Sequence, residues 1–214
     1  MIARRALPAL LGLLPLPLAA EEPPPLSDAQ VLLFETPHLA ALHPPLRLDY
    51  GFRREAAGHA PVEDAIRLSI LASEVPGRRD VVPEFLTGPR AIHYPPAPGF
   101  RGNPLLLFAL DRQARELSAA TGGAHAWFRN RIRRALALAP SPERTTAPFE
   151  GDDIEAAEII LHPFAGEPRA GRFQDQRLRF VLAESMPGWI QAIDTELPVG
   201  AVRETIRFAE AVPL

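Results

Sequence analysis

The sequence predicts a single α+β domain: a curved antiparallel β-sheet of about seven or eight strands, with an αα-hairpin from mid-chain packed on one face. Three observations predict this fold class. Apolar and polar residues alternate with a period of two in both halves of the chain, apolar residues recur at helical spacing between about residues 104 and 138, and Pro- and Gly-containing turns separate these segments.

The first strands are expected after the Pro44-Pro45 pair. Leu46, Leu48, Tyr50 and Phe52 alternate with Arg47, Asp49, Gly51 and Arg53, which is typical of a strand with one face in a core and one in water. Strands over residues 64–71 and 80–86 follow, with a tight turn at Pro76-Gly77 between them. These three elements predict an antiparallel meander. A short fourth strand is expected at residues 91–94, which have proline on both sides.

The pattern then becomes helical. Asn103 is a good N-cap and Pro104 fits the first helical position, and Gly122-Gly123 ends the helix. The pairs Asp111 with Arg115 and Arg112 with Glu116 stand four residues apart and support it. A second helix is expected over about residues 124–138. Together the two helices form the predicted hairpin.

Strands return after the hairpin. They are expected at residues 145–149, 154–162, 178–182, 189–196 and 202–209. The turn at Ser185-Met186-Pro187-Gly188 favours a type II geometry between two of them. In the last strand Ile206 and Phe208 are expected to face inward.

The beginning of the chain predicts a secretory signal peptide over residues 1–20. Arg4 and Arg5 precede an apolar stretch rich in Leu, Ala and Pro, and cleavage is expected after Ala20, so that the mature chain starts near Glu21 in the periplasm. Residues 21–45 form a Pro-rich N-terminal segment with a short helix near residues 27–42, and residues 46–214 form the single α+β domain.

Composition excludes several classes of function. The chain has 0 Cys, so there is no disulfide framework, thiol nucleophile or thiolate metal site, and all 23 basic residues are Arg. Without lysine, Schiff-base chemistry and a phosphate-binding P-loop are excluded. Loss of residues 1–20 would lower the formal net charge from −3 to −5, which gives no whole-molecule attraction for nucleic acid.

Candidate site residues lie mostly on the second helix. Arg129, Arg131, Arg133 and Arg134 form the densest positive cluster, which suits phosphate headgroups or an acidic partner, although a solvated helix face explains the same residues. Trp127 and Trp189 are expected as core anchors or as walls of a cavity. The histidines have no metal-site spacing, so no metal and no cofactor is expected.

Two segments carry a resemblance. Residues 100–136, FRGNPLLLFALDRQARELSAATGGAHAWFRNRIRRAL, and residues 179–198, RFVLAESMPGWIQAIDTELP, resemble a family of exported proteobacterial proteins with no assigned activity. More loosely, strands around helices after an export signal resemble the half-barrel of periplasmic lipoprotein carriers. That resemblance implies an apolar cavity between sheet and helices.

Three functions are consistent with the sequence. The first is a non-enzymatic periplasmic protein that binds an apolar or lipid-like ligand. The second is an envelope protein that acts in protein–protein interaction or assembly, and the third is a periplasmic hydrolase built around His93, His125 or His162 and nearby acids. No nucleic-acid partner and no transmembrane segment in the mature chain are expected.

Overall fold

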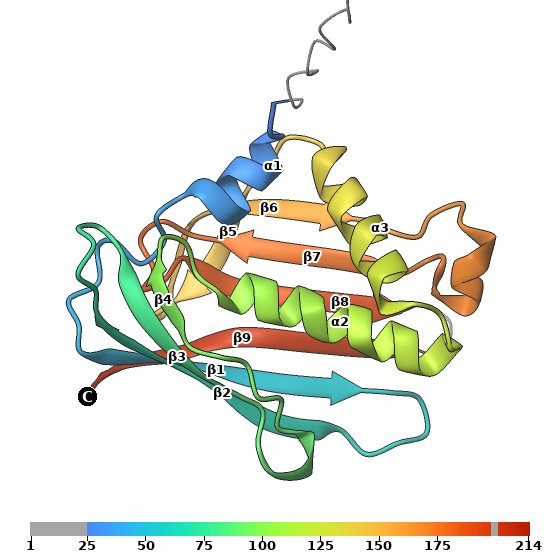
Figure 1. Ribbon diagram of the computed structural model, residues 1–214, viewed down its shortest axis with the longest axis horizontal. Helices are drawn as coiled ribbons and strands as arrows, with labels where there is room; N and C mark the ends of the chain where they lie inside the picture. Colours follow the sequence, from blue (N-terminus) through green and yellow to red (C-terminus); the bar gives the residue numbers. More distant parts are fainter. Residues whose placement is uncertain (1–24, 198–200) are drawn as a thin grey trace, which may run out of the picture.

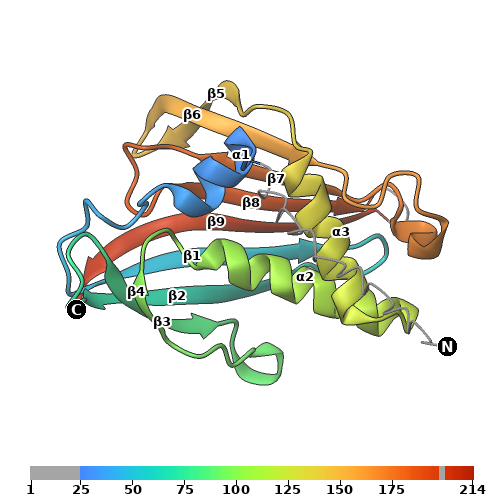
Figure 2. The same ribbon diagram turned by 45° about the horizontal axis from the view of Figure 1, so that its top comes forward.

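The computed structural model describes residues 25–197 and 201–214, and the predicted signal peptide lies outside them. Its architecture is α+β, with one open, curved antiparallel sheet whose strand order is β4-β3-β2-β1-β9-β8-β7-β6-β5. Figures 1 and 2 show the helices on one face of this sheet. The predicted fold class is confirmed, although the described sheet has nine strands and not seven or eight.

The strands have the following bounds: β1 Leu46–Glu55, β2 Val62–Ala72, β3 Arg79–Phe85, β4 Ala97–Phe100, β5 Glu143–Phe149, β6 Asp152–Leu161, β7 Arg177–Leu182, β8 Ile190–Leu197 and β9 Val202–Pro213. Strands β1, β2 and β3 form the predicted meander, and Leu48, Tyr50 and Phe52 are buried as the alternation of apolar and polar residues requires. Strands β5 to β8 form a second meander. Strand β9 lies between the two and pairs with β1 and β8.

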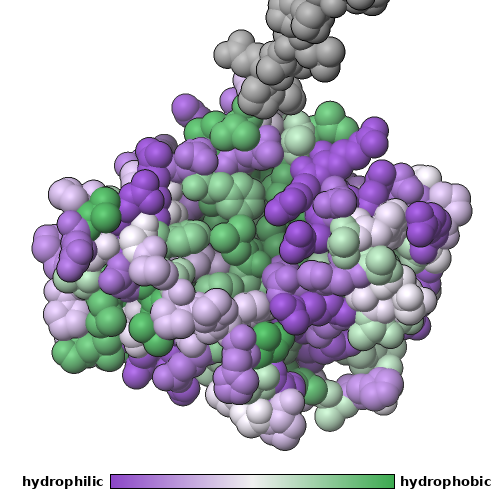
Figure 3. Space-filling model, viewed as in Figure 1, coloured by the Kyte–Doolittle hydropathy of each residue, from purple (hydrophilic) through white to green (hydrophobic). Residues whose placement is uncertain are grey.

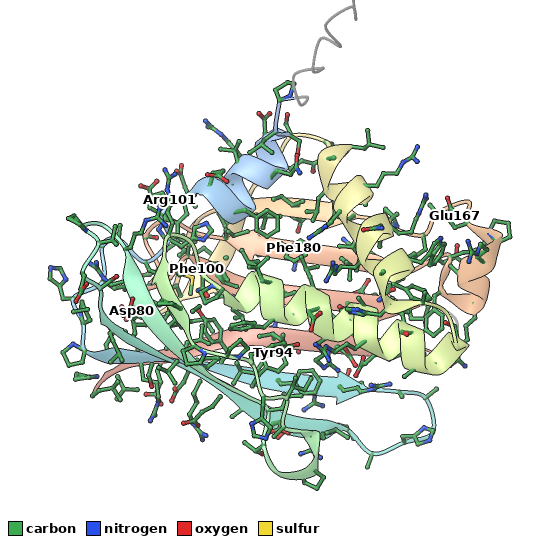
Figure 4. The ribbon with its side chains drawn as sticks, in the orientation of Figure 1. Asp80, Tyr94, Phe100, Arg101, Glu167 and Phe180 are labelled. Atoms are coloured by element: carbon green, nitrogen blue, oxygen red, sulfur yellow. The ribbon has the colours of Figure 1, made fainter. Side chains whose placement is uncertain are left out.

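The fourth strand was predicted at the wrong place. Residues 91–94 make only an isolated bridge, between Ile92 and Phe85, and the strand itself is β4 at Ala97–Phe100. Pro95 and Pro96 lack the N–H groups that a ladder needs, so pairing resumes only after them. Tyr94, in the intervening segment, stacks on Phe108 of helix α2 (Leu105–Thr121) with ring centroids 4.5 Å apart, and Figure 4 shows it beside that helix.

The N-terminal segment begins as predicted and ends early. Ser27 forms a capping box with Gln30 at the start of α1 Asp28–Gln30, which continues as the π-helix η1 Val31–Glu35. The expected extension to residue 42 is wrong, because Pro37 holds Thr36 in an extended conformation. The Ser27 hydroxyl also donates to the Leu136 carbonyl at 2.8 Å, so α1 lies against the end of helix α3 (His125–Ala137), as Figure 1 shows.

Two consecutive helices stand where the αα-hairpin was predicted. Helix α2 Leu105–Thr121 ends at Gly122, which has φ +70°, and helix α3 His125–Ala137 follows. Asn103 accepts a hydrogen bond from the Leu105 N–H through Oδ1, so it acts as the predicted cap. The two expected pairs are present, with Arg115 Nε 2.5 Å from Asp111 and Arg112 Nη2 2.6 Å from Glu116.

Side chains of the helices and the sheet fill the core between them. Its largest fully buried members are Tyr50, Phe85, Phe128, Phe164 and Phe180, the last of which Figure 4 shows on β7. A hollow beneath the middle of α2, lined in part by Phe52, Leu110 and Phe180, measures about 10 Å³. It has room for about one water molecule. The roomier cavity expected between sheet and helices is not found at this place.

Candidate functional site

A hollow, here called the end cavity, opens where β1 ends and β9 begins. Its volume is about 760 Å³. The last turns of α2, the 3₁₀ helix η3 Pro168–Phe173 and strand β8 complete it; these elements meet at the right of Figure 1. Its apolar walls are Leu117, Ala119 and Ala120 of α2, Phe173 of η3, and Leu197 and Val202 of the sheet. This size and apolar lining are typical of small-molecule sites.

Glu204, which lines the end cavity, belongs to a buried ion pair. Glu204 of β9 is 5% exposed and Arg112 of α2 is 4% exposed. The guanidinium donates to both carboxylate oxygens, at 2.9 and 3.0 Å, and Arg54 Nη1 lies 3.0 Å from Glu204. Such a bidentate pair fixes helix α2 on strand β9 and neutralises a charge that would otherwise be costly to bury.

Two glutamine amides extend this network into the end cavity. Gln113 donates to Glu204 at 2.8 Å, so its carbonyl oxygen must face the other way, where it accepts from Gln176 Nε2 at 3.1 Å. Because Gln176 donates through Nε2, the orientation of its amide is also determined, with Oε1 on the other side. Its Oε1 is buried and has no donor within the described residues, although the side chain lines the cavity. A buried acceptor of this kind is suited to receive a donor from a ligand.

The two carboxylates of the end cavity have opposite pKa shifts. Burial and the nearby charge of Glu204 raise the pKa of Glu116 above its usual range, despite the opposing effect of Arg112. Burial alone would also raise the pKa of Glu204, but hydrogen bonds and charge from Arg112, with the charge of Arg54, hold it below its usual value. Mild acidification therefore protonates Glu116 first, while Glu204 stays ionised.

The mouth of the end cavity carries polar side chains. Arg172 and His59 line it and are both exposed, and the Arg172 guanidinium lies 5.0 Å from the centroid of the Phe173 ring. The cavity thus combines apolar walls, a buried polar network at one side and charged groups at its opening.

The two tryptophans singled out from the sequence lie outside the end cavity. Trp127 packs against Phe128 and Phe164, with ring centroids 4.8 and 6.1 Å away, and Arg169 covers its ring. Trp189 has a positive φ of 65°, which is rare for a bulky residue, and its ring lies 5.4 Å from that of His38. It lines a second hollow, of about 540 Å³, beside β5 to β7.

The four predicted arginines do not share one hollow. Arg129 and Arg133 line a groove between the N-terminal helices, α2 and α3, whereas Arg131 and Arg134 line another hollow beside β6. Arg131 also forms an ion pair with Glu167, which Figure 4 shows in the loop that precedes η3. The helix turns by about 100° per residue, so neighbours in sequence point in different directions.

The histidines form no catalytic constellation in the described part of the chain. His125 Nε2 lies 3.3 Å from Asp111, but it makes no hydrogen bond there, and Asp111 already accepts from Arg115 and Tyr94. Within residues 25–197 and 201–214, no three His, Asp or Glu side chains are grouped to hold a metal ion. No helix in the same ranges is both long and apolar enough to cross a membrane.

Sequence reasoning missed the residues that define the end cavity. Glu204 occupies an inward position of β9, two residues before Ile206, and a charge at such a position was the available signal. Its partner Arg112 is 92 residues away. No local spacing could have connected them.

Comparisons with known proteins give weak similarities only. No family model and no curated protein matches the chain. Among solved structures it is similar to lipoprotein LppX of Mycobacterium tuberculosis, with 11% identity over 78% of this chain and 87% of that one and a TM-score of 0.35. It is also similar to a LolA superfamily protein of Nitrosomonas europaea, with 11% identity over 87% and 93% of the two chains and a TM-score of 0.23.

A third similarity is to the MucA/MucB complex of Pseudomonas aeruginosa. Identity is 15% over 86% of this chain, the TM-score is 0.37, and the match spans 56% of that chain, little more than half its length.

Proposed function

We propose that this protein is a non-enzymatic, exported protein of the cell envelope that binds an apolar or lipid-like ligand in the end cavity. The observation that carries the proposal is a hollow of about 760 Å³ with apolar walls and a few convergent polar groups. Leu117 and Phe173 offer an apolar surface to the body of the ligand. A hydroxyl or amide of the ligand supplies the donor that Gln176 Oε1 lacks among the described residues.

Occupation of the cavity can be tested by filling it. Ala120 is exposed at the cavity wall, so Ala120→Trp blocks the space without disturbing the core, and Ala126→Trp places the same side chain on an exposed position of α3 outside the cavity. We expect wild type and the Ala126→Trp variant to bind the neutral fluorescent probe N-phenyl-1-naphthylamine with one site, and the Ala120→Trp variant to lose most of this binding. Equal binding by both variants would contradict the proposal.

The natural ligand and the export step need the protein from a bacterial envelope. Native mass spectrometry of the full-length chain expressed with its own N-terminus should show a bound lipid-like mass that the Ala120→Trp variant lacks. The mature chain should begin near Glu21 and occur in the periplasmic fraction. Retention of residues 1–20 in that fraction would refute cleavage, and repeated absence of any bound mass would refute ligand binding.

A further inference from the structure

A second surface feature is separate from the end cavity. A groove of about 370 Å³, here called the helical groove, lies between the N-terminal helices, α2 and α3. Its apolar lining comes from Phe34 of η1, Leu107 and Leu110 of α2, and Ile132 and Leu136 of α3. Leu107, in the first turn of α2, is 44% exposed, although its neighbours Leu106 and Phe108 are buried. In Figure 3 this region is an apolar hollow with hydrophilic side chains on the α3 side.

The charges at the helical groove are unbalanced. Arg129 and Arg133 line it from α3, both are exposed, and neither forms an ion pair or side-chain hydrogen bond with any residue in 25–197 or 201–214. The one carboxylate in the lining, Asp111, is already paired with Arg115 at 2.5 Å and accepts from Tyr94. Among the described residues, nothing compensates these two positive charges on one wall of the groove.

The spacing of these charges matches a helix. Arg129 and Arg133 are four residues apart on α3, so their Cβ atoms stand about 5–6 Å from one another along the helix axis. Two acidic side chains four residues apart on an incoming helix have the same spacing. The apolar floor lies between two helical walls, which is the arrangement that receives the apolar face of an amphipathic helix.

We infer that the helical groove docks an acidic amphipathic helix of a partner protein. Apolar side chains of that helix cover Leu107, Leu110 and Ile132, and two carboxylates one turn apart pair with Arg129 and Arg133. This inference does not depend on ligand binding in the end cavity, which lies at the other end of α2.

The test uses two synthetic helical peptides, each about 18 residues or five turns long. Both have a leucine face; one has glutamates four residues apart beside that face, and the other has lysines at the same positions. Binding to the full chain is measured by fluorescence anisotropy for wild type, for Arg129→Glu/Arg133→Glu and for Leu107→Ser. Arg134→Glu is the matched control, because Arg134 is an exposed arginine of the same helix that does not line the groove.

Wild type should bind the glutamate peptide about tenfold more tightly than the lysine peptide. The glutamate peptide gains two exposed ion pairs, the lysine peptide has two like-charge contacts in their place, and the combined difference in binding free energy corresponds to about this ratio. The double reversal should invert the preference, Leu107→Ser should weaken both peptides, and Arg134→Glu should leave the preference in place. The Ala120→Trp variant should bind the peptide normally, which separates this test from that of the end cavity.

Three results would overturn the inference. One is equal binding of both peptides, or no binding of either. Another is a loss in the Arg134→Glu variant as large as in the double variant. The third is that phosphatidylglycerol vesicles bind with the same dependence on Arg129 and Arg133 while the glutamate peptide does not, which would assign the surface to an anionic membrane.

Discussion

Replacement of Arg112 by methionine tests the buried ion pair that joins α2 to β9. The change keeps an unbranched side chain of similar length but removes the guanidinium from Glu204, leaving Arg54 and Gln113 as that carboxylate's partners. Because Arg112 also lies 4.8 Å from the centroid of the Phe52 ring, methionine retains much of the packing there. The loss of stability then reports mainly on the charge.

The size of the loss follows from burial. Both residues of the pair are about 95% buried, and the removal of one partner of such a pair typically costs about 3–5 kcal/mol. Arg54 keeps one contact with Glu204, but its side chain is 42% exposed and is screened by solvent. We therefore expect a decrease in the free energy of unfolding near the lower end, about 3 kcal/mol at pH 7.

The pH dependence distinguishes charge from packing. In wild type the pKa of Glu204 is below its unfolded value, so the stability from this group is present above about pH 4.3 and is lost as the pH falls through the lower folded pKa. In Arg112→Met the carboxylate is poorly compensated and its folded pKa should rise. The difference in free energy of unfolding between the variant and wild type should then be smallest below about pH 4.3. It should grow as the pH increases, because the poorly compensated carboxylate ionises.

The assay is urea unfolding at a series of pH values, with Arg112→Met/Glu204→Gln as the control. The double variant has no buried charge at this site, so it should recover most of the loss at pH 7 and show no pH trend from this site. A cost below about 1 kcal/mol in the single variant, with the same pH trend as wild type, would refute the argument.

Three further predictions concern a carboxylate of the end cavity, a turn and a carboxylate of strand β2. The pKa of Glu116 is already raised by burial, and an apolar probe that covers this side chain should raise that pKa further. Binding of the probe should therefore tighten as the pH falls, and Glu116→Gln should abolish this pH dependence in a fluorescence titration. Gly188→Ala should destabilise the protein by about 2 kcal/mol or more in urea unfolding, because φ is +72° and the new Cβ would stand 2.6 Å from Leu48 Cδ1; Gly58→Ala, with φ +75° and open space, should cost clearly less. Burial opposes ionisation of Asp64, but hydrogen bonds that include those from Thr87 and Arg90 hold its pKa at about 2. Asp64→Asn should therefore lose about 1–2 kcal/mol at pH 7, and the difference from wild type should vanish as the pH falls through about 2.

Local rules predicted most of the elements. The alternation of apolar and polar residues in β1 and β2 reflects a sheet with one buried face, and the cap at Asn103 with Gly122 at the other end defines α2 to within a residue or two. The prediction placed β4 too early in the chain, because Pro95 and Pro96 have no N–H groups to donate and strand pairing resumes only after them. Residues 91–94 have a favourable composition but an unsuitable position in the ladder.

The end cavity could not be predicted in the same way. It forms where the turn after β1, the end of α2, η3 and two sheet strands meet, and none of these segments has an unusual pattern of its own. The Arg cluster of α3 was conspicuous in sequence, yet the turn of the helix divides it between two hollows. Side-chain direction, which local composition does not specify, decided which residues lie together.

The position of β9 has a consequence for the order of assembly. Each of the two meanders is held by contacts between neighbours in sequence, whereas β9 joins them through pairings with β1, about 150 residues earlier in the chain. Until this strand is in place, β1 and β8 both present open edges, and neither half can complete the shared core. The same arrangement predicts slow, cooperative folding that is exposed to aggregation until β9 has inserted.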